Sequence, residues 1–150
     1  MREVNIYLDA KYINDKDEGA FGYYIESESY RFSGGGGYYR TSCPRMEMRA
    51  CIEAMKQVLK DFGSGTRIHI HTKQYALIRA LIRGRTKASK DNTNQDLYME
   101  AKVSLSLVCC IEENLNMDGI YKAQRMTITA LEQENKQQDR PDKTRAIPLF

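Results

Sequence analysis

The chain has 150 residues, of which 41% are hydrophobic and 29% charged, a balance typical of one globular domain and not of a disordered segment. No apolar run approaches the ~20 residues of a membrane-spanning helix, and the N-terminus lacks the apolar stretch of a secretory signal, so we expect a cytoplasmic protein. The formal net charge of +3 is too small to indicate a partner by itself.

The first forty residues predict a strand followed by a hairpin. Val4–Leu8 alternates between apolar and polar positions, which predicts a strand ending at Asp9. The aromatic-rich stretches Phe21–Ile25 and Tyr30–Ser33 are separated by polar residues, which predicts two paired strands. The run Gly34–Gly37 lacks the following lysine and helix start of a phosphate-binding loop, so we expect a bulge or turn in the ribbon.

The middle of the chain predicts a long helix and a strand. Pro44 precedes a helical pattern that ends at Gly63. Its apolar residues recur at helical spacing: Met48, Cys51, Ile52, Met55, Val58 and Leu59. In the strand Thr66–Thr72, His69 and His71 share one face, where they are either metal ligands or part of a half-exposed surface.

The last third predicts three helices and one strand. A short helix begins at Tyr75, and a third helix covers residues 97–106. An apolar strand follows at Leu107–Ile111, and the last helix covers Ile120–Gln137. The segment 138–150 is polar and then abruptly apolar, with two prolines, so we expect an extended tail whose IPLF end is a candidate for docking a protein partner.

This order of elements defines the expected fold class. Three strands, a helix, a strand, two helices, a strand and a helix predict an α/β domain over residues 1–137. The sheet is expected to be mixed and five-stranded, with three antiparallel strands and then two parallel ones, flanked by helices.

A basic cluster follows the second helix. Five cations and no acid occur in this segment: Arg79, Arg83, Arg85, Lys87 and Lys90. A concentrated cationic segment is typical of a contact with a phosphate backbone. The alternative is a solvated helix end.

Four motifs, which lie in matching order along this series of elements, resemble the ribonuclease H family. The resemblance covers the chain from about Val4 to Leu131. Arg45–Ala50 (RMEMRA) is similar to the family's R-M-E-L-x-A signature at the start of its first long helix. Ile6–Ala10 (IYLDA) resembles its first strand with a terminal aspartate. Thr72–Tyr75 (TKQY) resembles T-D-S-Q-Y, and Asp96–Tyr98 (DLY) resembles D-L-W. The resemblance implies a ribonuclease H-like fold and a function on RNA–DNA hybrids.

The resemblance also implies a catalytic site, which this sequence fills only in part. The family hydrolyses RNA with two divalent metals held by four carboxylates. Asp9 matches the first carboxylate and Glu47 the second. The third position falls on Thr72 or Lys73, and the fourth falls on Gln124, so neither is an acid. We therefore expect Asp9 and Glu47 to bind Mg²⁺ or Mn²⁺ weakly or not at all. The alternative to metal binding is that the two acids are polar groups hydrogen-bonded to nearby amides.

Two other residues are candidates for a remodelled metal site. Asp118 would reach the metal only if the loop before the last helix were repacked, and its alternative role is to cap that helix. His71 as a ligand would favour Mn²⁺ over Mg²⁺. Gln74 matches the family's glutamine that faces the minor groove.

Three interpretations follow, and they leave open whether the protein is an enzyme. The first is a catalytically degraded ribonuclease H-like domain that binds RNA–DNA hybrid or structured RNA through Gln74 and the basic cluster. The second is an active metal-dependent hybrid endoribonuclease with a remodelled site. The third is a non-catalytic scaffold for protein interaction, and the fold alone does not choose among them.

Overall fold

The computed structural model of the chain describes residues 2–82, 94, 96–97, 100, 108–112 and 116–139. The elements are β1 (Arg2–Ile13), the short 3-10 helix η1 (Asn14–Lys16), β2 (Glu18–Ser27), β3 (Tyr30–Tyr39), α1 (Cys43–Phe62), β4 (Thr66–His71), α2 (Tyr75–Ile82), β5 (Val108–Glu112), α4 (Met117–Glu132) and β6 (Gln137–Gln138). No helix among these residues is both long and apolar enough to cross a membrane.

The strands form one mixed sheet in the order β5-β4-β1-β2-β3-β6. β1, β2 and β3 pair antiparallel, while β4 and β5 add parallel strands beside β1. The predicted mixed α/β sheet is therefore confirmed, but it has six strands instead of five, because the two-residue strand β6 pairs parallel to β3. The last helix was expected to reach Gln137 but ends at Glu132, because Gln133 takes an extended backbone and the chain turns to pair Gln137 with Tyr38.

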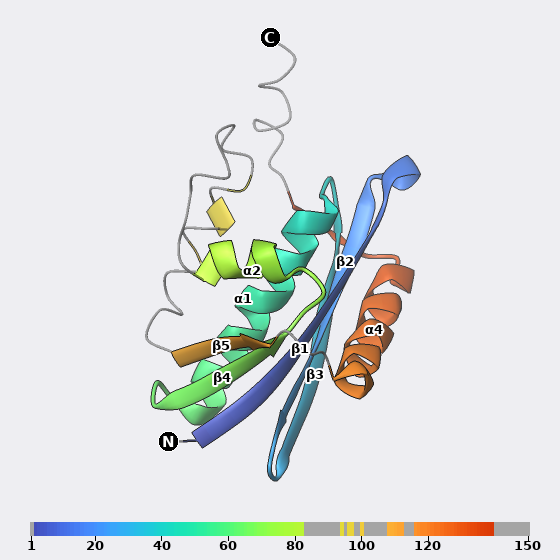
Figure 1. Cartoon of the computed structure of the whole chain (residues 1–150). Helices are drawn as coiled ribbons and strands as arrows, with labels where there is room; N and C mark the ends of the chain where they lie inside the picture. The colour runs from blue at the N-terminus through green and yellow to red at the C-terminus, as the bar shows by residue number, and fades with distance from the viewer. Residues whose placement is uncertain are drawn as a thin grey trace.

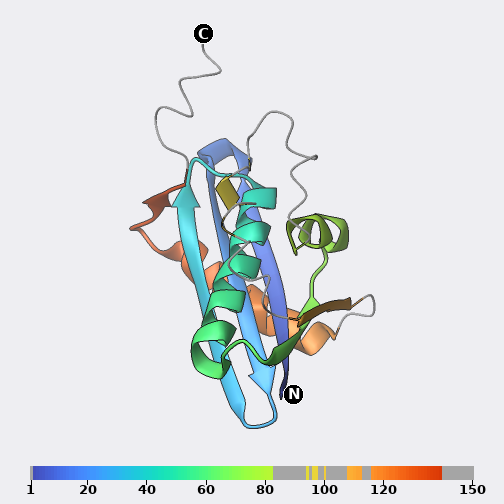
Figure 2. The ribbon, with the colours of Figure 1, turned by 90° about the vertical axis from the view of Figure 1, so that its left-hand side faces the viewer.

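The helices cover the sheet on both faces (Figure 1 and Figure 2): α1 and α2 lie on one face and α4 lies on the other. Residues alternate between the faces along β1. Ile6 and Leu8 belong to the main core with α1, whereas Tyr7 packs against Ala123 of α4. Asp9, two residues after Tyr7, therefore lies on the α4 face.

β1 is longer than expected, which changes the position of Asp9. The strand was expected to end at Asp9, but its pairing with β2 continues from Asp9 opposite Gly22 to Ile13 opposite Glu18. Its parallel pairing with β4 stops at Tyr7. Asp9 therefore lies just past the point where β1 and β4 separate, beside the residues that follow β4.

The glycine run of β3 forms no bulge. Gly34 to Gly37 pair in unbroken register with β2, so that expectation was wrong. A Cβ added at Gly35 would lie 2.5 Å from the Phe21 carbonyl oxygen, and one at Gly37 would lie 2.9 Å from that of Ala130 in α4. The glycines are needed because backbone of β2 and α4 approaches β3 closely.

The helix ends follow local chemistry. Ser42 caps α1 by accepting a hydrogen bond from the Arg45 amide (3.3 Å), and Pro44 stands in the first turn. Gly63, with φ +80°, ends the helix as expected. At α4 the cap is Asn116, not Asp118, so the capping role considered for Asp118 was wrong.

Two expected segments fall mainly outside the described residues. Asp96, Leu97 and Glu100 are helical, as the third helix requires, but the rest of that helix is not described. The tail is described only as far as Asp139, and the IPLF end lies outside the described residues.

Candidate functional site

Asp9 and Glu47 lie near each other where β1 separates from β4. Glu47 is in the second turn of α1, and only 4% of its surface is exposed. Burial, together with the negative charge of Asp9, raises the pKa of Glu47 to about 7, against the lowering effect of a hydrogen bond from Thr72. Burial also raises the pKa of Asp9. Two acids are thus held in a partly dry environment in which Glu47 is about half protonated at neutral pH.

The residues after β4 complete one side of the site. The buried Thr72 hydroxyl donates to Glu47 Oε1 at 2.6 Å and accepts from the Gln74 amide at 2.9 Å. Thr72, one of the two residues considered for the third acidic position, is thus bound to the carboxylate of Glu47. Lys73 and Gln74 are exposed, and the Lys73 charge opposes the rise in the pKa of both Asp9 and Glu47.

The last helix contributes Thr127. This buried side chain is a hydrogen-bond partner of Asp9 and lowers the pKa of Asp9. Its hydroxyl also lies 3.2 Å from the Ala123 carbonyl oxygen, so its single proton is shared between two acceptors. Gln124, expected at the fourth carboxylate position, is half-buried and makes no such contact among the described residues. Thr127 was not expected from the sequence, because a single polar residue on the buried face of a helix gives no local sign of the acid that it meets.

The two candidate substitute ligands lie elsewhere. His71 is buried with its ring stacked on Tyr7 at 4.2 Å, and its Nε2 lies 2.9 Å from Asn5 Oδ1. Burial lowers the pKa of His71. Asp118 is exposed in the first turn of α4. Neither side chain contacts Asp9 or any other acid of the site in the described part of the chain.

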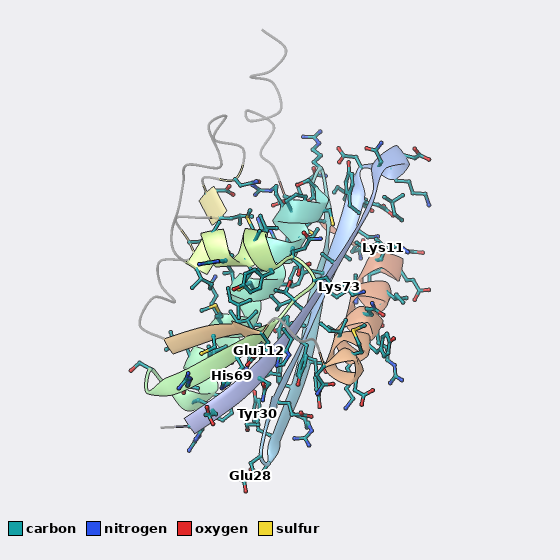
Figure 3. All side chains as sticks on the ribbon, viewed as in Figure 1. Lys11, Glu28, Tyr30, His69, Lys73 and Glu112 are labelled. Atoms are coloured by element: carbon teal, nitrogen blue, oxygen red, sulfur yellow. The ribbon has the colours of Figure 1, made fainter. Side chains whose placement is uncertain are left out.

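His69 belongs to a different surface. Its ring lies between two acids from neighbouring strands, 3.0 Å from Glu3 and 2.8 Å from Glu112 (Figure 3). These contacts join β1, β4 and β5 on the outside of the sheet. His69 is therefore part of a half-exposed strand surface, which was the alternative to its binding a metal.

The residues present do not fit a pair of divalent metals. Each Mg²⁺ ion takes oxygen ligands, several of them water, and is held through one or two carboxylates, so a pair of ions calls for two to four carboxylates that are free to bind. Here Asp9 and Glu47 each receive a threonine hydroxyl and face Lys73. Across the described ranges, no three metal-ligating side chains of the His, Cys, Asp or Glu type come together. The donor set therefore favours hydroxyl and ammonium partners over metal ions.

A buried ion-pair network fixes the start of α1. Asp139, from the end of β6, has no exposed side chain; it accepts from Arg45 Nε at 2.7 Å and from Thr41 Oγ1 at 2.6 Å. Arg49 binds the same carboxylate, and Arg45 binds Asp96 through two bonds of 2.9 and 2.8 Å. Burial favours a higher pKa for Asp139, but these hydrogen bonds outweigh it and lower the pKa. The network brackets Glu47 on its helix and was not expected from sequence.

Only part of the expected nucleic-acid surface is described. Gln74 is exposed directly before α2, and Arg79 is exposed on α2 with its guanidinium 6.0 Å from the Tyr75 ring centre. Four members of the basic cluster lie outside the described residues: Arg83, Arg85, Lys87 and Lys90.

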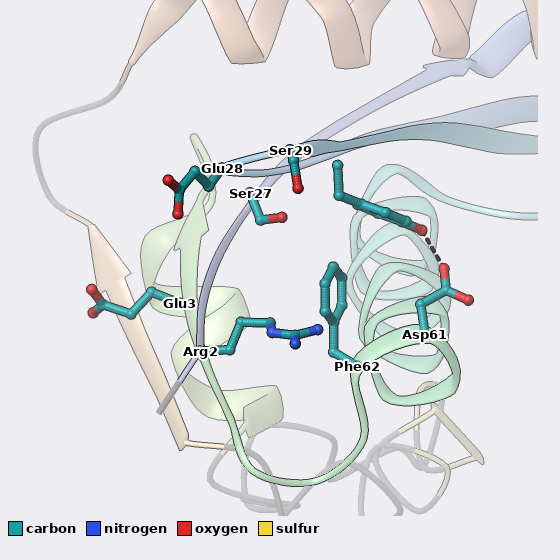
Figure 4. A pocket seen from close by; sticks show the side chains of 8 residues that line it. Arg2, Glu3, Ser27, Glu28, Ser29, Asp61 and Phe62 are labelled. Carbon is teal, nitrogen blue, oxygen red and sulfur yellow. Dashed lines mark hydrogen bonds between the residues drawn. The ribbon is translucent and has the colours of Figure 1, made fainter.

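A cavity of about 790 Å³ lies at the other end of the molecule (Figure 4). It is lined by the β2–β3 turn, the start of β1 and the end of α1. The Arg2 guanidinium lies 5.1 Å from the Phe62 ring centre, and the Tyr30 hydroxyl donates to Asp61. Phe62 ends the helix whose first turns carry Glu47, so this cavity is separate from the paired acids.

Solved structures match the fold, although no protein-family model and no curated protein matches the sequence. RNase H1 of the halophilic archaeon Halobacterium salinarum has 18% identity and a TM-score of 0.65, over 85% of this chain and 96% of that one. The N-terminal RNase H domain of a Mycobacterium tuberculosis protein has 16% identity and a TM-score of 0.70, over 88% and 95%. LC11-RNase H1, solved in complex with RNA/DNA hybrid, has 17% identity and a TM-score of 0.55, over 86% and 96%.

The chain therefore has a ribonuclease H-like fold. Identities this low show the fold alone, and one fold can host many functions.

Proposed function

We propose that this chain is a catalytically degraded ribonuclease H-like domain that binds RNA–DNA hybrid or structured RNA without hydrolysing it. The observation that carries the proposal is the pairing of each remaining acid with a hydroxyl, Glu47 with Thr72 and Asp9 with Thr127. In this proposal the two threonines stand in for two of the carboxylates that would hold the metals, Thr127 rather than the Gln124 expected from the resemblance.

Hydrolysis fails in this proposal for an electrostatic reason. Two-metal catalysis stabilises both the attacking and the leaving oxygen with divalent charge. The site offers two carboxylates, and Glu47, with a pKa of about 7, is half neutral under physiological conditions. The Lys73 ammonium beside both acids repels any cation that enters. Weak binding of one Mn²⁺ or Mg²⁺ ion is the most that this set of groups supports.

Binding makes fewer demands than catalysis. A hybrid presents a wide, shallow minor groove with 2′-hydroxyls, which proteins recognise by shape and by backbone contacts. Gln74 and Arg79 are exposed on the segment that follows Thr72, so this segment offers an amide and a cation to a ligand. LC11-RNase H1, which shares the fold, was solved with such a hybrid bound. A cytoplasmic location and a protein partner for the tail remain predictions of the sequence.

The decisive experiment measures cleavage and binding on the same substrates. Labelled hybrid, duplex RNA and single strands are incubated with Mg²⁺ or Mn²⁺, and binding is followed by fluorescence anisotropy. We expect binding to hybrid or RNA without product formation. Turnover that Asp9→Asn abolishes would overturn the proposal and establish the remodelled nuclease instead.

The metal sites can be tested by restoring acids. In the double variant Thr72→Asp/Thr127→Asp, four carboxylates surround the site, so we expect Mn²⁺ to raise the melting temperature of the variant by several degrees and that of the parent hardly at all. Asp118→Asn/Thr129→Asp changes exposed positions of α4 and is the matched control. A parent chain that already binds two Mn²⁺ ions tightly would contradict the proposal.

A further inference from the structure

Two exposed lysines flank the paired acids. Lys73 follows Thr72 directly, and Lys11 stands two residues after Asp9 on the same face of β1. Figure 3 shows both lysines away from the hairpin tip that carries Glu28. They come from different segments, the end of β1 and the residues after β4, which meet only in the folded chain.

The charges of these lysines act on the acids. Lys73 lowers the pKa of both Asp9 and Glu47, and Lys11 lowers that of Asp9, in each case against the effect of burial. Neither ammonium forms an ion pair with an acid in the described part of the chain. Both therefore remain available to a ligand while they offset the acids beneath them.

The charge balance differs in kind from that of a metal site. Two divalent ions are balanced by four carboxylates. Here Asp9 and the half-protonated Glu47 face two ammonium groups, so the negative charge of the acids is offset without any metal. Without the lysines, the two acids would repel a nucleic-acid phosphate. The positive charges of Lys11 and Lys73 attract the phosphate and so oppose that repulsion.

We propose that Lys73, together with Lys11, binds a phosphodiester group of nucleic acid beside the paired acids, so that ammonium groups replace metal ions as the cationic contact. The inference rests on the proposed function and adds its chemistry. Gln74 follows Lys73 in the chain, so a phosphate contact and a contact to the groove edge come from neighbouring residues. Binding by this route requires no divalent metal and weakens with salt, because each phosphate contact releases condensed counterions.

The test is a salt titration of hybrid binding in EDTA and in Mg²⁺, followed by anisotropy of a labelled hybrid. The parent is expected to bind with the same affinity in both buffers. Lys73→Gln should weaken binding several-fold and flatten the log–log salt slope by about one unit. Lys11→Gln should change the affinity and the slope in the same direction. Lys73→Arg keeps the positive charge and should preserve the parental affinity and slope.

The matched control is Lys60→Gln. Lys60 is an exposed lysine in the last turn of the helix that carries Glu47, about 20 Å further along the axis. The Lys60→Gln variant should bind hybrid like the parent. Circular dichroism should show that all four variants are folded.

The outcomes separate this inference from the proposed function. A parent that fails to bind hybrid or RNA in either buffer overturns the proposed function. A parent that binds only when Mg²⁺ is present overturns the lysine contact and leaves the proposed function in place. Lys73→Gln with parental affinity and slope, or a loss equal to that of Lys60→Gln, also overturns the lysine contact.

Discussion

Glu47 shows how burial changes the chemistry of a single carboxyl group. Its carboxylate is almost fully buried, accepts one hydrogen bond from Thr72 and lies near the charge of Asp9. In water a glutamate pKa is near 4.3, so a value of about 7 means that the folded protein holds a proton that the unfolded chain releases. That difference makes stability depend on pH.

The sign of this dependence gives the first prediction. Since the pKa of Glu47 is raised on folding, the folded state binds more protons between pH 4.5 and 7, and the free energy of unfolding falls as pH rises through that window. Glu47→Gln keeps the acceptor for Thr72 and removes the titration, so it should stabilise the protein by up to roughly 3 kcal/mol at pH 8 and very little near pH 4.5.

Urea unfolding at both pH values measures this effect. Asp118→Asn, which removes an exposed acid from α4, serves as the control and should track the parent at both pH values. An equal gain for Glu47→Gln at pH 4.5 and pH 8 would show that Glu47 does not hold a proton in the folded state.

At the scale of elements, the end of the chain fastens the helix that carries Glu47. β6 is only two residues long, yet it delivers Asp139 to Arg45 and Arg49, which lie two residues before and two after Glu47. Thr41, just ahead of α1, binds the same carboxylate. The position of Glu47 is therefore set by residues almost a hundred positions away in the sequence.

Removing this carboxylate gives the second prediction. Asp139→Ala leaves two guanidinium groups without their shared partner, of which Arg45 is nearly fully buried, and should lower the free energy of unfolding by about 3–5 kcal/mol. Glu132→Ala removes an exposed acid near the same end of the chain and should cost less than about 0.5 kcal/mol. Urea denaturation compares the two, and similar small losses would mean that the network contributes little.

At the scale of the whole molecule, the sheet and α4 form two layers that touch through backbone. A Cβ added at Gly22, opposite Asp9 in the β1–β2 pair, would lie 2.2 Å from the Ala123 carbonyl oxygen and 2.6 Å from the Thr127 hydroxyl. The absence of a side chain at Gly22 therefore brings α4, and Thr127 with it, within reach of Asp9. The shape of the site depends on how closely the two layers pack.

Separating these layers gives the third prediction. Gly22→Ala should push α4 from the sheet and lower the free energy of unfolding by about 1–3 kcal/mol or more. Gly65→Ala, where an added Cβ meets nothing within 4 Å, should be nearly neutral. Thermal melts of both variants provide the comparison, and equal melting temperatures would contradict the close approach.

The sequence by itself determined the elements and the fold class. Alternation in β1, the apolar stripe of α1, and Pro44 and Gly63 at the ends of that helix are local signals, because they depend on residues that are neighbours in the chain. The motif around Glu47 and the aspartate at position 9 likewise indicated the ribonuclease H-like fold that the solved structures share.

Only the tertiary structure decided what surrounds the two acids. Thr127, Lys11 and Asp139 carried no local sign of their roles, and the glycine run was mistaken for a bulge. The physical reason is that burial, charge interactions and close backbone contacts depend on distances between segments far apart in sequence. Hydrophobic periodicity specifies which face of an element is buried, but it does not specify which polar group from another element will meet that face.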